Sequence, residues 1–228
     1  MRKKDILLIT NYFPPEKGAA ANRMHSLAAA LSNNNYSVTI VCPLPNYPNG
    51  KIQTAYKGSF YSKSVEHGMS ISRLWIWPSN SKNTFLRLLS MFSFSISLHF
   101  YFLFKKIPKV VVVQYSPIFI GVTAVFWARI LNKRIVLNVS DLWPKAGLEM
   151  GLLKRGFYYS VLEKMEYFCY RKSNLILGQS EEILTHIGKL YPAKDTFLYR
   201  NFPNFNSSSL TYEDASRSIT IVYAGLLG

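Results

Sequence analysis

The chain has 228 residues, 49% of them hydrophobic, so it can bury a substantial core and is not disordered along its whole length. It carries 27 Lys and Arg against 12 Asp and Glu, a net charge of +15 that favours an anionic partner: a nucleotide, a nucleic acid or an anionic membrane face. The alternative is a solvated basic surface that serves only solubility.

The first predicted element is a strand at residues 5–10. It follows a basic start, but its apolar run is too short for a secretory signal peptide. Cys42 and Cys169 form no CxxC or Cys/His pattern, which indicates a reducing compartment and argues against a structural zinc site. We therefore expect a cytoplasmic protein.

Further apolar runs of strand length follow along the chain. They are continuous rather than alternating, which is typical of strands buried on both faces of a parallel sheet. The strands predicted after the first are residues 37–42, 109–114, 134–139, 174–178, 196–200 and 218–225.

Helices are predicted between the strands. Ser116 followed by Pro117 is a good helix start, and so is Ser180 with two glutamates in the first turn. This alternation predicts an α/β fold: a Rossmann-like parallel sheet, with helices on both faces and right-handed crossovers. The helices predicted from these patterns are residues 21–32, 116–131, 156–172 and 180–190.

Two segments depart from the simple alternation. Residues 58–77 are predicted to form two strands around a His67–Gly68 turn, an inserted hairpin at the sheet edge or on a face. Residues 85–104 are mostly apolar and long enough to span a membrane, but an arginine, a histidine and four serines favour a packed helix, with an interfacial helix as the alternative.

The end of the sequence predicts a domain boundary. Residues 201–217 are polar and Ser-rich, and residues 218–228 begin a new strand and a glycine loop. We therefore expect a first domain at residues 1–200, a linker, and the start of a second domain, in an N-terminal part of a longer protein.

The loop TNYFPPEKG after the first strand is the first candidate ligand site. It lacks GxGxxG, so it is not a dinucleotide fingerprint. However, Gly18 lets a ligand approach the backbone, and the unpaired N–H groups of the following helix suit a phosphate, with Lys17 and Arg23 adding charge. The alternative is that Ala19 and its neighbours only pack the helix against the sheet.

Three more candidates lie after later strands. Asp141, in SDLWP, follows the strand at 134–139 at the carboxyl edge of the sheet; its alternative role is to cap a short helix beginning at Leu142. Asn46 and Tyr47 supply an amide and an aromatic face suited to a sugar, unless their loop is only a turn. Tyr115 also ends a strand, beside a serine that could cap the next helix. The four histidines have no metal-ligand spacing, so we predict no protein-bound metal.

Six segments in a fixed order resemble one enzyme family. They resemble the bacterial GT-B glycosyltransferases of the retaining family 4 type, and most closely the capsule and O-antigen branch that includes N-acetyl-fucosamine transferases. This resemblance implies two Rossmann-like domains, an N-terminal one that binds mainly acceptor and a C-terminal one that binds mainly donor. The segments are YFPPEKGAAANR, LPNYPNGK, SDLWP, LILGQSEEILTHI, RNFPN and IVYAGLLG.

The resemblance also implies roles for residues. Gly18, Ala19 and Arg23 would lie at the donor pyrophosphate, although the family often has Gly-Gly where this chain has Gly-Ala. Asp141 would lie near the transferring sugar, where a carboxylate can stabilise developing positive charge. The loop of Asn46 and Tyr47 would face the acceptor, together with Tyr115 at its strand end.

The function implied is transfer of a sugar, such as an N-acetylated amino-deoxy sugar, from UDP to a polyprenyl-linked saccharide, without a cofactor. The basic and aromatic residues between 73 and 109 would rest on the inner face of the cytoplasmic membrane. We find no nucleic-acid-binding motif. The alternative from another class is a non-catalytic Rossmann-like module that binds a nucleotide or nucleic acid.

Overall fold

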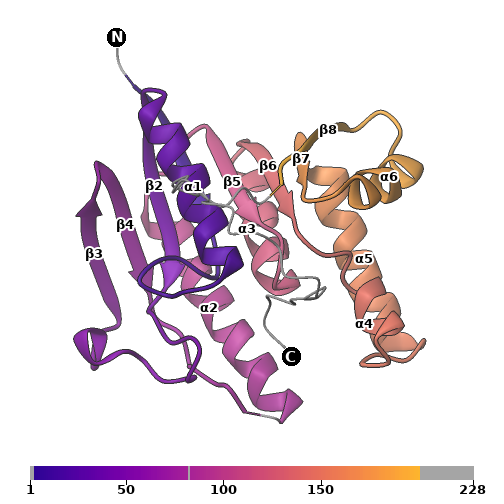
Figure 1. Cartoon of the computed structure of the whole chain (residues 1–228), viewed down its shortest axis with the longest axis horizontal. Helices are drawn as coiled ribbons and strands as arrows, with labels where there is room; N and C mark the ends of the chain where they lie inside the picture. The colour runs from indigo at the N-terminus through magenta and orange to yellow at the C-terminus, as the bar shows by residue number, and fades with distance from the viewer. Residues whose placement is uncertain (1–2, 82, 201–228) are drawn as a thin grey trace, which may run out of the picture.

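The computed structural model describes residues 3–81 and 83–200, which form one eight-stranded sheet with helices on both faces (Figure 1). The strand order is β3-β4-β2-β1-β5-β6-β7-β8, and every neighbouring pair is parallel except β3 with β4. The predicted Rossmann-like α/β class is confirmed. The strands are β1 (Lys4–Ile9), β2 (Tyr36–Pro43), β3 (Tyr61–Glu66), β4 (Met69–Leu74), β5 (Val110–Gln114), β6 (Arg134–Val139), β7 (Leu175–Gly178) and β8 (Asp195–Leu198).

The helices divide between the two faces because the sheet grows in opposite directions from β1. Strands β2 to β4 lie on one side of β1, and strands β5 to β8 lie on the other. The step from β1 to β2 places α1 on one face, where Met24 and Ala28 pack on Leu8 and Ile40. The later steps run the other way, so right-handed crossovers place the remaining long helices on the opposite face. The helices are α1 (Ala19–Asn33), the 3-10 turn η1 (Thr54–Tyr56), α2 (Thr84–Phe104), α3 (Ile118–Ile130), α4 (Lys145–Glu149), α5 (Phe157–Lys172) and α6 (Glu181–Leu190).

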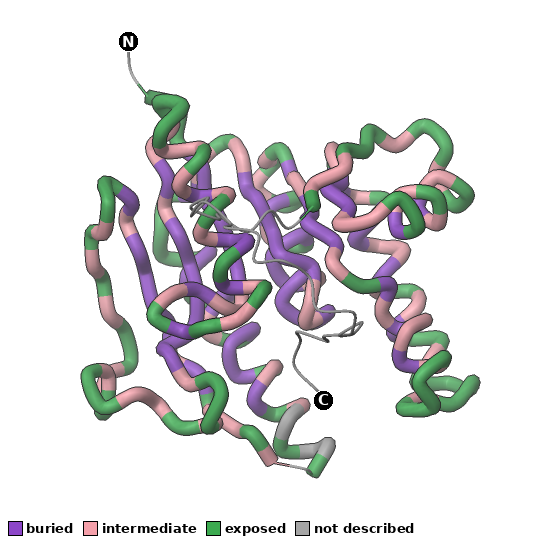
Figure 2. Tube along the Cα trace, in the orientation of Figure 1, coloured by how far each residue is buried: buried purple, intermediate pink, exposed green. Residues whose placement is uncertain are grey.

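Burial follows the apolar strands. Figure 2 shows the buried residues concentrated along the central strands, while the outer helix faces and the connecting loops are exposed. In β5 the run of four valines lies in the middle of the sheet, where β-branched side chains pack well on the pleated surface. The continuous apolar runs of the sequence thus correspond to strands covered on both faces.

The predicted hairpin is an integral part of the sheet. β3 is the antiparallel edge strand, and β4 pairs in parallel with β2, so the edge placement is the correct one of the two that the sequence left open. Its turn has positive φ at both His67 (49°) and Gly68 (76°), the backbone that a tight two-residue hairpin turn requires.

Helix α2 has a packed and an exposed side. Phe94 and Leu98 are fully buried in the core, which confirms the packed helix, whereas Ile96, Phe100 and Leu103 are more than half exposed. Within the part of the chain that the structure describes, no helix is both long and apolar enough to cross a membrane.

The two predicted helix starts differ in outcome. Ser180 caps α6 as expected, since its hydroxyl accepts a hydrogen bond from the backbone N–H of Ile183 at 3.3 Å. The prediction for Ser116 is wrong, because α3 begins at Ile118 with Pro117 at the capping position and has no side-chain cap among the described residues. The predicted linker and the strand after it lie outside the described residues.

Candidate functional site

The candidate site lies at the carboxyl edge of the sheet, where the strand order reverses between β1 and β5. In open α/β sheets, ligands bind at such a switch point because the loops diverge there and leave a crevice. The loops that follow β1, β2, β5 and β6 reach this edge together with the start of α1. They carry the site residues predicted from the sequence.

The loop after β1 and the loop after β2 share one cavity. Gly18 and Lys17 from the first loop line it together with Tyr47 from the second, and its volume is about 500 Å³. The remaining lining residues are Pro15, Pro48 and Gln53. The structure therefore brings together two residues that were assigned to different substrates, Gly18 to the donor and Tyr47 to the acceptor.

Gly18 holds the position before α1 with a φ of +144°, a conformation that side chains with a Cβ rarely adopt. Ala19 is already the first residue of α1 and is exposed. A second glycine, as in the family that the sequence resembles, is therefore not needed for the backbone here, because of these two positions only Gly18 has positive φ. The first N–H groups of an α-helix have no acceptor within the helix, so those of α1 suit an anion.

Arg23 lies one turn further along α1 and is almost fully buried. Its guanidinium donates to Oε1 of Gln179 at 2.7 Å and to the hydroxyl of Ser140. Burial lowers the pKa of Arg23 from its ordinary value, and the negative charge of Asp141 acts in the opposite direction. Arg23 thus ties α1 to the loops after β6 and β7, next to the predicted catalytic carboxylate.

Asp141 is exposed at the carboxyl end of β6. The alternative that it caps a helix beginning at Leu142 is wrong, because the short helix α4 begins at Lys145 with Pro144 at the capping position. The side chain of Asp141 is thus at the open edge of the sheet and close enough to Arg23 to affect its pKa.

Asn46 and Tyr47 are fixed by an acidic residue that was not predicted to belong to the site. Oε1 of Glu16 accepts hydrogen bonds from the backbone N–H groups of Asn46 (2.8 Å) and Tyr47 (2.9 Å), although Glu16 is buried. The side-chain amide of Asn46 donates within its own loop, to the carbonyl of Leu44 at 2.9 Å. Tyr47 remains exposed, and its ring meets that of Tyr12 edge-on at 5.5 Å.

Tyr115 is buried in the core next to the candidate site. Its side chain has no exposed surface, and its hydroxyl donates to the carbonyl of Trp143 at 2.8 Å. A second cavity, of about 360 Å³, lies between the carboxyl edge and helices α2, α3 and α5, and its lining includes Tyr12, Ser116 and Trp143. In this structure Tyr115 supports one wall of that cavity and does not line it.

A row of buried polar side chains forms the floor beneath these loops. The Thr10 hydroxyl donates to Oε1 of Gln114, which also accepts from the N–H of Asn11 at 3.1 Å. Asn138 pairs in register with Gln114 and is fully buried, yet its side-chain atoms have no hydrogen-bond partner within the described part of the chain. Gln114 and Asn138 are not among the predicted site residues, although a polar residue at the end of an apolar strand is the signal that finds them.

The chemistry available at this edge is recognition of an anion and of hydroxyl groups. The start of α1 offers N–H groups, Lys17 offers an exposed positive charge, and Asp141 offers an exposed carboxylate, while the positive charge of Arg23 is buried beside them. Among residues 3–81 and 83–200, no group of three or more His, Cys, Asp and Glu side chains could hold a metal ion. The absence of a protein-bound metal stays a prediction.

Several solved structures resemble this chain in fold at low sequence identity. No protein-family model and no curated protein matches the sequence. Among solved structures, a sucrose-phosphate synthase from Thermosynechococcus elongatus superposes with a TM-score of 0.56 at 11% identity, over 88% of this chain and 91% of that chain.

Two further structures were solved with nucleotides or nucleotide sugars. UGT89C1 of Arabidopsis thaliana, complexed with UDP-L-rhamnose, gives a TM-score of 0.55 at 12% identity over 90% of this chain and 50% of that one. LpCGTa in complex with UDP gives 0.52 at 12% identity over 87% and 51%. At these identities the likeness shows the fold alone: this chain has the fold of one Rossmann-like half of a GT-B glycosyltransferase.

Proposed function

We propose that this chain is the acceptor-side half of a glycosyltransferase that uses a nucleotide-sugar donor. The observation that carries the proposal is the cavity shared by Gly18 and Tyr47, at the start of α1 and at the carboxyl edge of a GT-B-like sheet. A helix start with a positive-φ glycine suits a phosphate, and an exposed tyrosine suits a sugar face. The structures of similar fold that hold UDP or UDP-L-rhamnose support the donor class.

Each predicted residue has a role in this proposal. The N–H groups after Gly18, with Ala19 at the first helical position, bind the donor diphosphate. Arg23 adds positive charge and holds the Ser140–Asp141 loop through its bond to Ser140. Asp141 stabilises positive charge that develops on the sugar during transfer.

The acceptor is proposed to lie between the two cavities, against Asn46 and Tyr47 on one side and Tyr12 and Trp143 on the other. Tyr115 contributes by holding the backbone of Trp143. From the sequence resemblance we propose a retaining enzyme, a UDP-activated N-acetylated amino-deoxy sugar, and a polyprenyl-linked saccharide acceptor of capsule or O-antigen synthesis.

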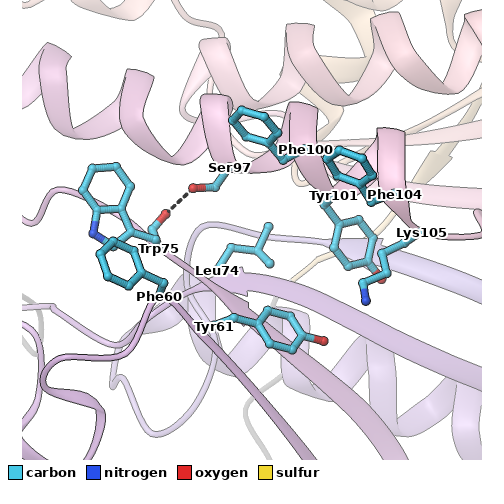
Figure 3. A pocket seen from close by; sticks show the side chains of 9 residues that line it. All are labelled: Phe60, Tyr61, Leu74, Trp75, Ser97, Phe100, Tyr101, Phe104 and Lys105. Carbon is cyan, nitrogen blue, oxygen red and sulfur yellow. Dashed lines mark hydrogen bonds between the residues drawn. The ribbon is translucent and has the colours of Figure 1, made fainter.

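A lipid-linked acceptor requires contact with a membrane, and α2 offers a suitable face. Figure 3 shows a groove between the hairpin and α2, in which Phe60 and Trp75 lie across from Phe100 and Phe104. At its end the ammonium group of Lys105 lies 5.7 Å from the centre of a tyrosine ring. Exposed apolar side chains beside lysines are typical of proteins that rest on an anionic leaflet, and we propose a peripheral location on the inner face of the cytoplasmic membrane.

The proposal is tested by a transfer assay on the protein as the cell makes it, with a panel of UDP-sugars and a polyprenyl-linked acceptor. We expect Asp141→Asn to lower kcat about a hundredfold, because charge stabilisation in a transition state is worth that much. Asp195→Asn changes an exposed aspartate at the opposite edge of the sheet and is expected to leave kcat unchanged.

NMR of the product reports whether the anomeric configuration is retained. Nucleotide binding without transfer to any acceptor would contradict the proposal and favour a binding module. Transfer that is equally fast in Asp141→Asn and in the control would exclude the proposed role of Asp141.

A further inference from the structure

Glu16 is a buried carboxylate in the loop after β1, and it forms hydrogen bonds with the loop after β2. Only 4% of its surface is exposed. One oxygen, Oε1, accepts from two consecutive backbone N–H groups of the loop after β2, those of Asn46 and Tyr47. The two loops that share the 500 Å³ cavity are therefore joined by a single carboxylate.

Arg73, on strand β4, holds the loop after β1 against the sheet. This side chain, on β4, is 1% exposed; it donates to the carbonyl of Pro14 at 2.7 Å and to Sγ of Cys42 at 3.3 Å. Its guanidinium also lies 3.6 Å from the carboxylate of Glu66, on β3. The residues before Glu16 are thus fixed to the sheet, while Glu16 itself reaches across to the next loop.

A carboxylate in this position is not explained by stability alone. Burying a charge is costly unless hydrogen bonds compensate for the lost water. Burial raises the pKa of Glu16, and it outweighs the opposing effects of the backbone N–H groups and of Arg73. A neutral side chain would be cheaper to bury here, so an acidic residue at this position costs folding stability, as is common at functional sites.

We propose that Glu16 is a positioning residue that, in its ionised form, holds the Asn46–Tyr47 backbone against the Gly18 loop and so sets the shape of the cavity between them. Protonation of Glu16 weakens both hydrogen bonds and releases Tyr47. The identity of the ligand in this cavity rests on the proposed function above. The role of Glu16 in holding the loop does not depend on that function.

Three charged or titratable groups lie around Glu16, and a pH experiment must distinguish their effects from that of Glu16. Arg73 approaches it from β4, the Cys42 thiol from β2, and Glu66 reaches it from β3 through Arg73. Burial raises the pKa of Cys42 to about 12, so the thiol stays neutral at moderate pH. Glu66 is a partly exposed second carboxylate beside Arg73, so a Glu66→Gln variant serves as a control for it.

Hydrogen exchange of the Asn46 and Tyr47 amides, measured by NMR between about pH 5 and pH 8 and corrected for intrinsic rates, tests the proposal on this chain without substrate. In the wild type, we expect protection of both amides to fall as pH is lowered. Glu16→Ala should exchange at least about tenfold faster at pH 8, because it removes hydrogen bonds to a charged acceptor. Glu16→Gln keeps an acceptor oxygen and should restore part of the protection while abolishing its pH dependence.

Amides of β6 serve as an internal reference for folding, and Glu181→Gln, an exposed glutamate on α6, is the matched control. Unchanged protection in Glu16→Ala, with the β6 amides intact, would overturn the proposal. A pH dependence in Glu16→Gln equal to that of the wild type would overturn it as well.

A second readout separates the proposal from the function on which it partly rests. In the transfer assay, Glu16→Gln should raise KM more than it lowers kcat and should lose the acid limb of the pH profile. If exchange responds as expected but the wild type transfers no sugar, then the proposed function fails and the hold on the loop stands. If exchange does not respond, then the hold fails whatever the transfer assay shows.

Discussion

Gly18 and Gly156 occupy the same position, immediately before a helix, but differ in backbone conformation. Gly18 has φ +144°, in the region that favours glycine, whereas Gly156 has φ 163°, which is extended backbone that any residue adopts. A Cβ added at either position would meet nothing within 4 Å among the described residues. The two sites therefore differ in conformation and not in available space.

This pair gives a matched prediction. Gly18→Ala should lower the free energy of unfolding by about 1–2 kcal/mol, because alanine is strained at positive φ. Gly156→Ala should leave stability unchanged or raise it by up to about 1 kcal/mol, because it reduces the freedom of the unfolded chain. Urea denaturation followed by circular dichroism measures both. Equal losses in the two variants would show that the conformation at residue 18 is not special.

Helix α5 carries a buried glutamate that is hydrogen-bonded to a tyrosine of the same helix. Glu166 and Tyr170 lie one turn apart, both are buried, and the tyrosine hydroxyl donates to the carboxylate at 2.8 Å. Burial raises the pKa of Glu166 to about 7, the hydrogen bond from Tyr170 acts to lower it, and Glu163 raises it further. This carboxyl lies under the wall that Tyr115 supports, since the rings of Tyr115 and Tyr170 are 5.9 Å apart.

The raised pKa predicts a pH-dependent stability. The folded state binds the Glu166 proton more tightly than the unfolded chain, whose pKa is near 4.5. The stability from this group is therefore complete below pH 4.5 and is lost as pH rises through about 7. The loss is on the order of 3 kcal/mol.

Glu166→Gln removes the titrating group and keeps its size. Thermal unfolding between about pH 5 and pH 8 should show a smaller fall of Tm in this variant than in the wild type. Glu181→Gln, exposed at the start of α6, should follow the wild type. Parallel Tm curves for all three proteins would contradict the assigned role of Glu166.

At the scale of the whole molecule, the charge of +15 and the exposed face of α2 make a joint prediction. If this face rests on an anionic leaflet, replacing Lys105, Lys106 and Lys109 together by glutamate should lower partitioning onto anionic vesicles by orders of magnitude. Each lysine near such a surface contributes about 1 kcal/mol. Binding of the wild type should also weaken as salt rises, because salt screens the charges.

Vesicle co-sedimentation measures the effect. The control is a triple variant with the same change in net charge at exposed lysines elsewhere in the chain, Lys154→Glu, Lys164→Glu and Lys189→Glu. All six lysines are exposed, so the fold should survive in both variants. If both variants lost vesicle binding equally, then binding would depend on the net charge of the protein and not on the face of α2.

The layers of this protein could be predicted from local sequence patterns. Continuous apolar runs predicted the positions of β1 and of β5 to β7 to within a residue or two, because strands covered on both faces need apolar side chains at every position. The hairpin could be predicted from its turn, because a tight turn needs residues such as Gly68 that adopt positive φ easily. Such features depend on a few neighbouring residues, and the sequence contains all of them.

The candidate site was predicted only in part. Gly18 and Asp141 follow β1 and β6 at the carboxyl edge of the sheet, and Arg23 lies close enough to Asp141 for its pKa to be affected, but their roles stay predictions. The caps expected at Ser116 and Asp141 were wrong because the following prolines take the capping positions themselves. The burial of Tyr115 could not be predicted, because a residue at the end of a strand points to the core or to the crevice according to what packs beneath it.

Which loops meet depends on the order of the strands in the folded sheet. Glu16 contacts residues 30 positions away, and Arg73 contacts Pro14 across 59 positions, so no local pattern contains either interaction. Both follow from strand order, since β1, β2 and β4 are neighbours in the sheet although they are separated in the chain. A sequence specifies the strands through short-range side-chain chemistry, but a site between loops exists only once the sheet has brought their ends together.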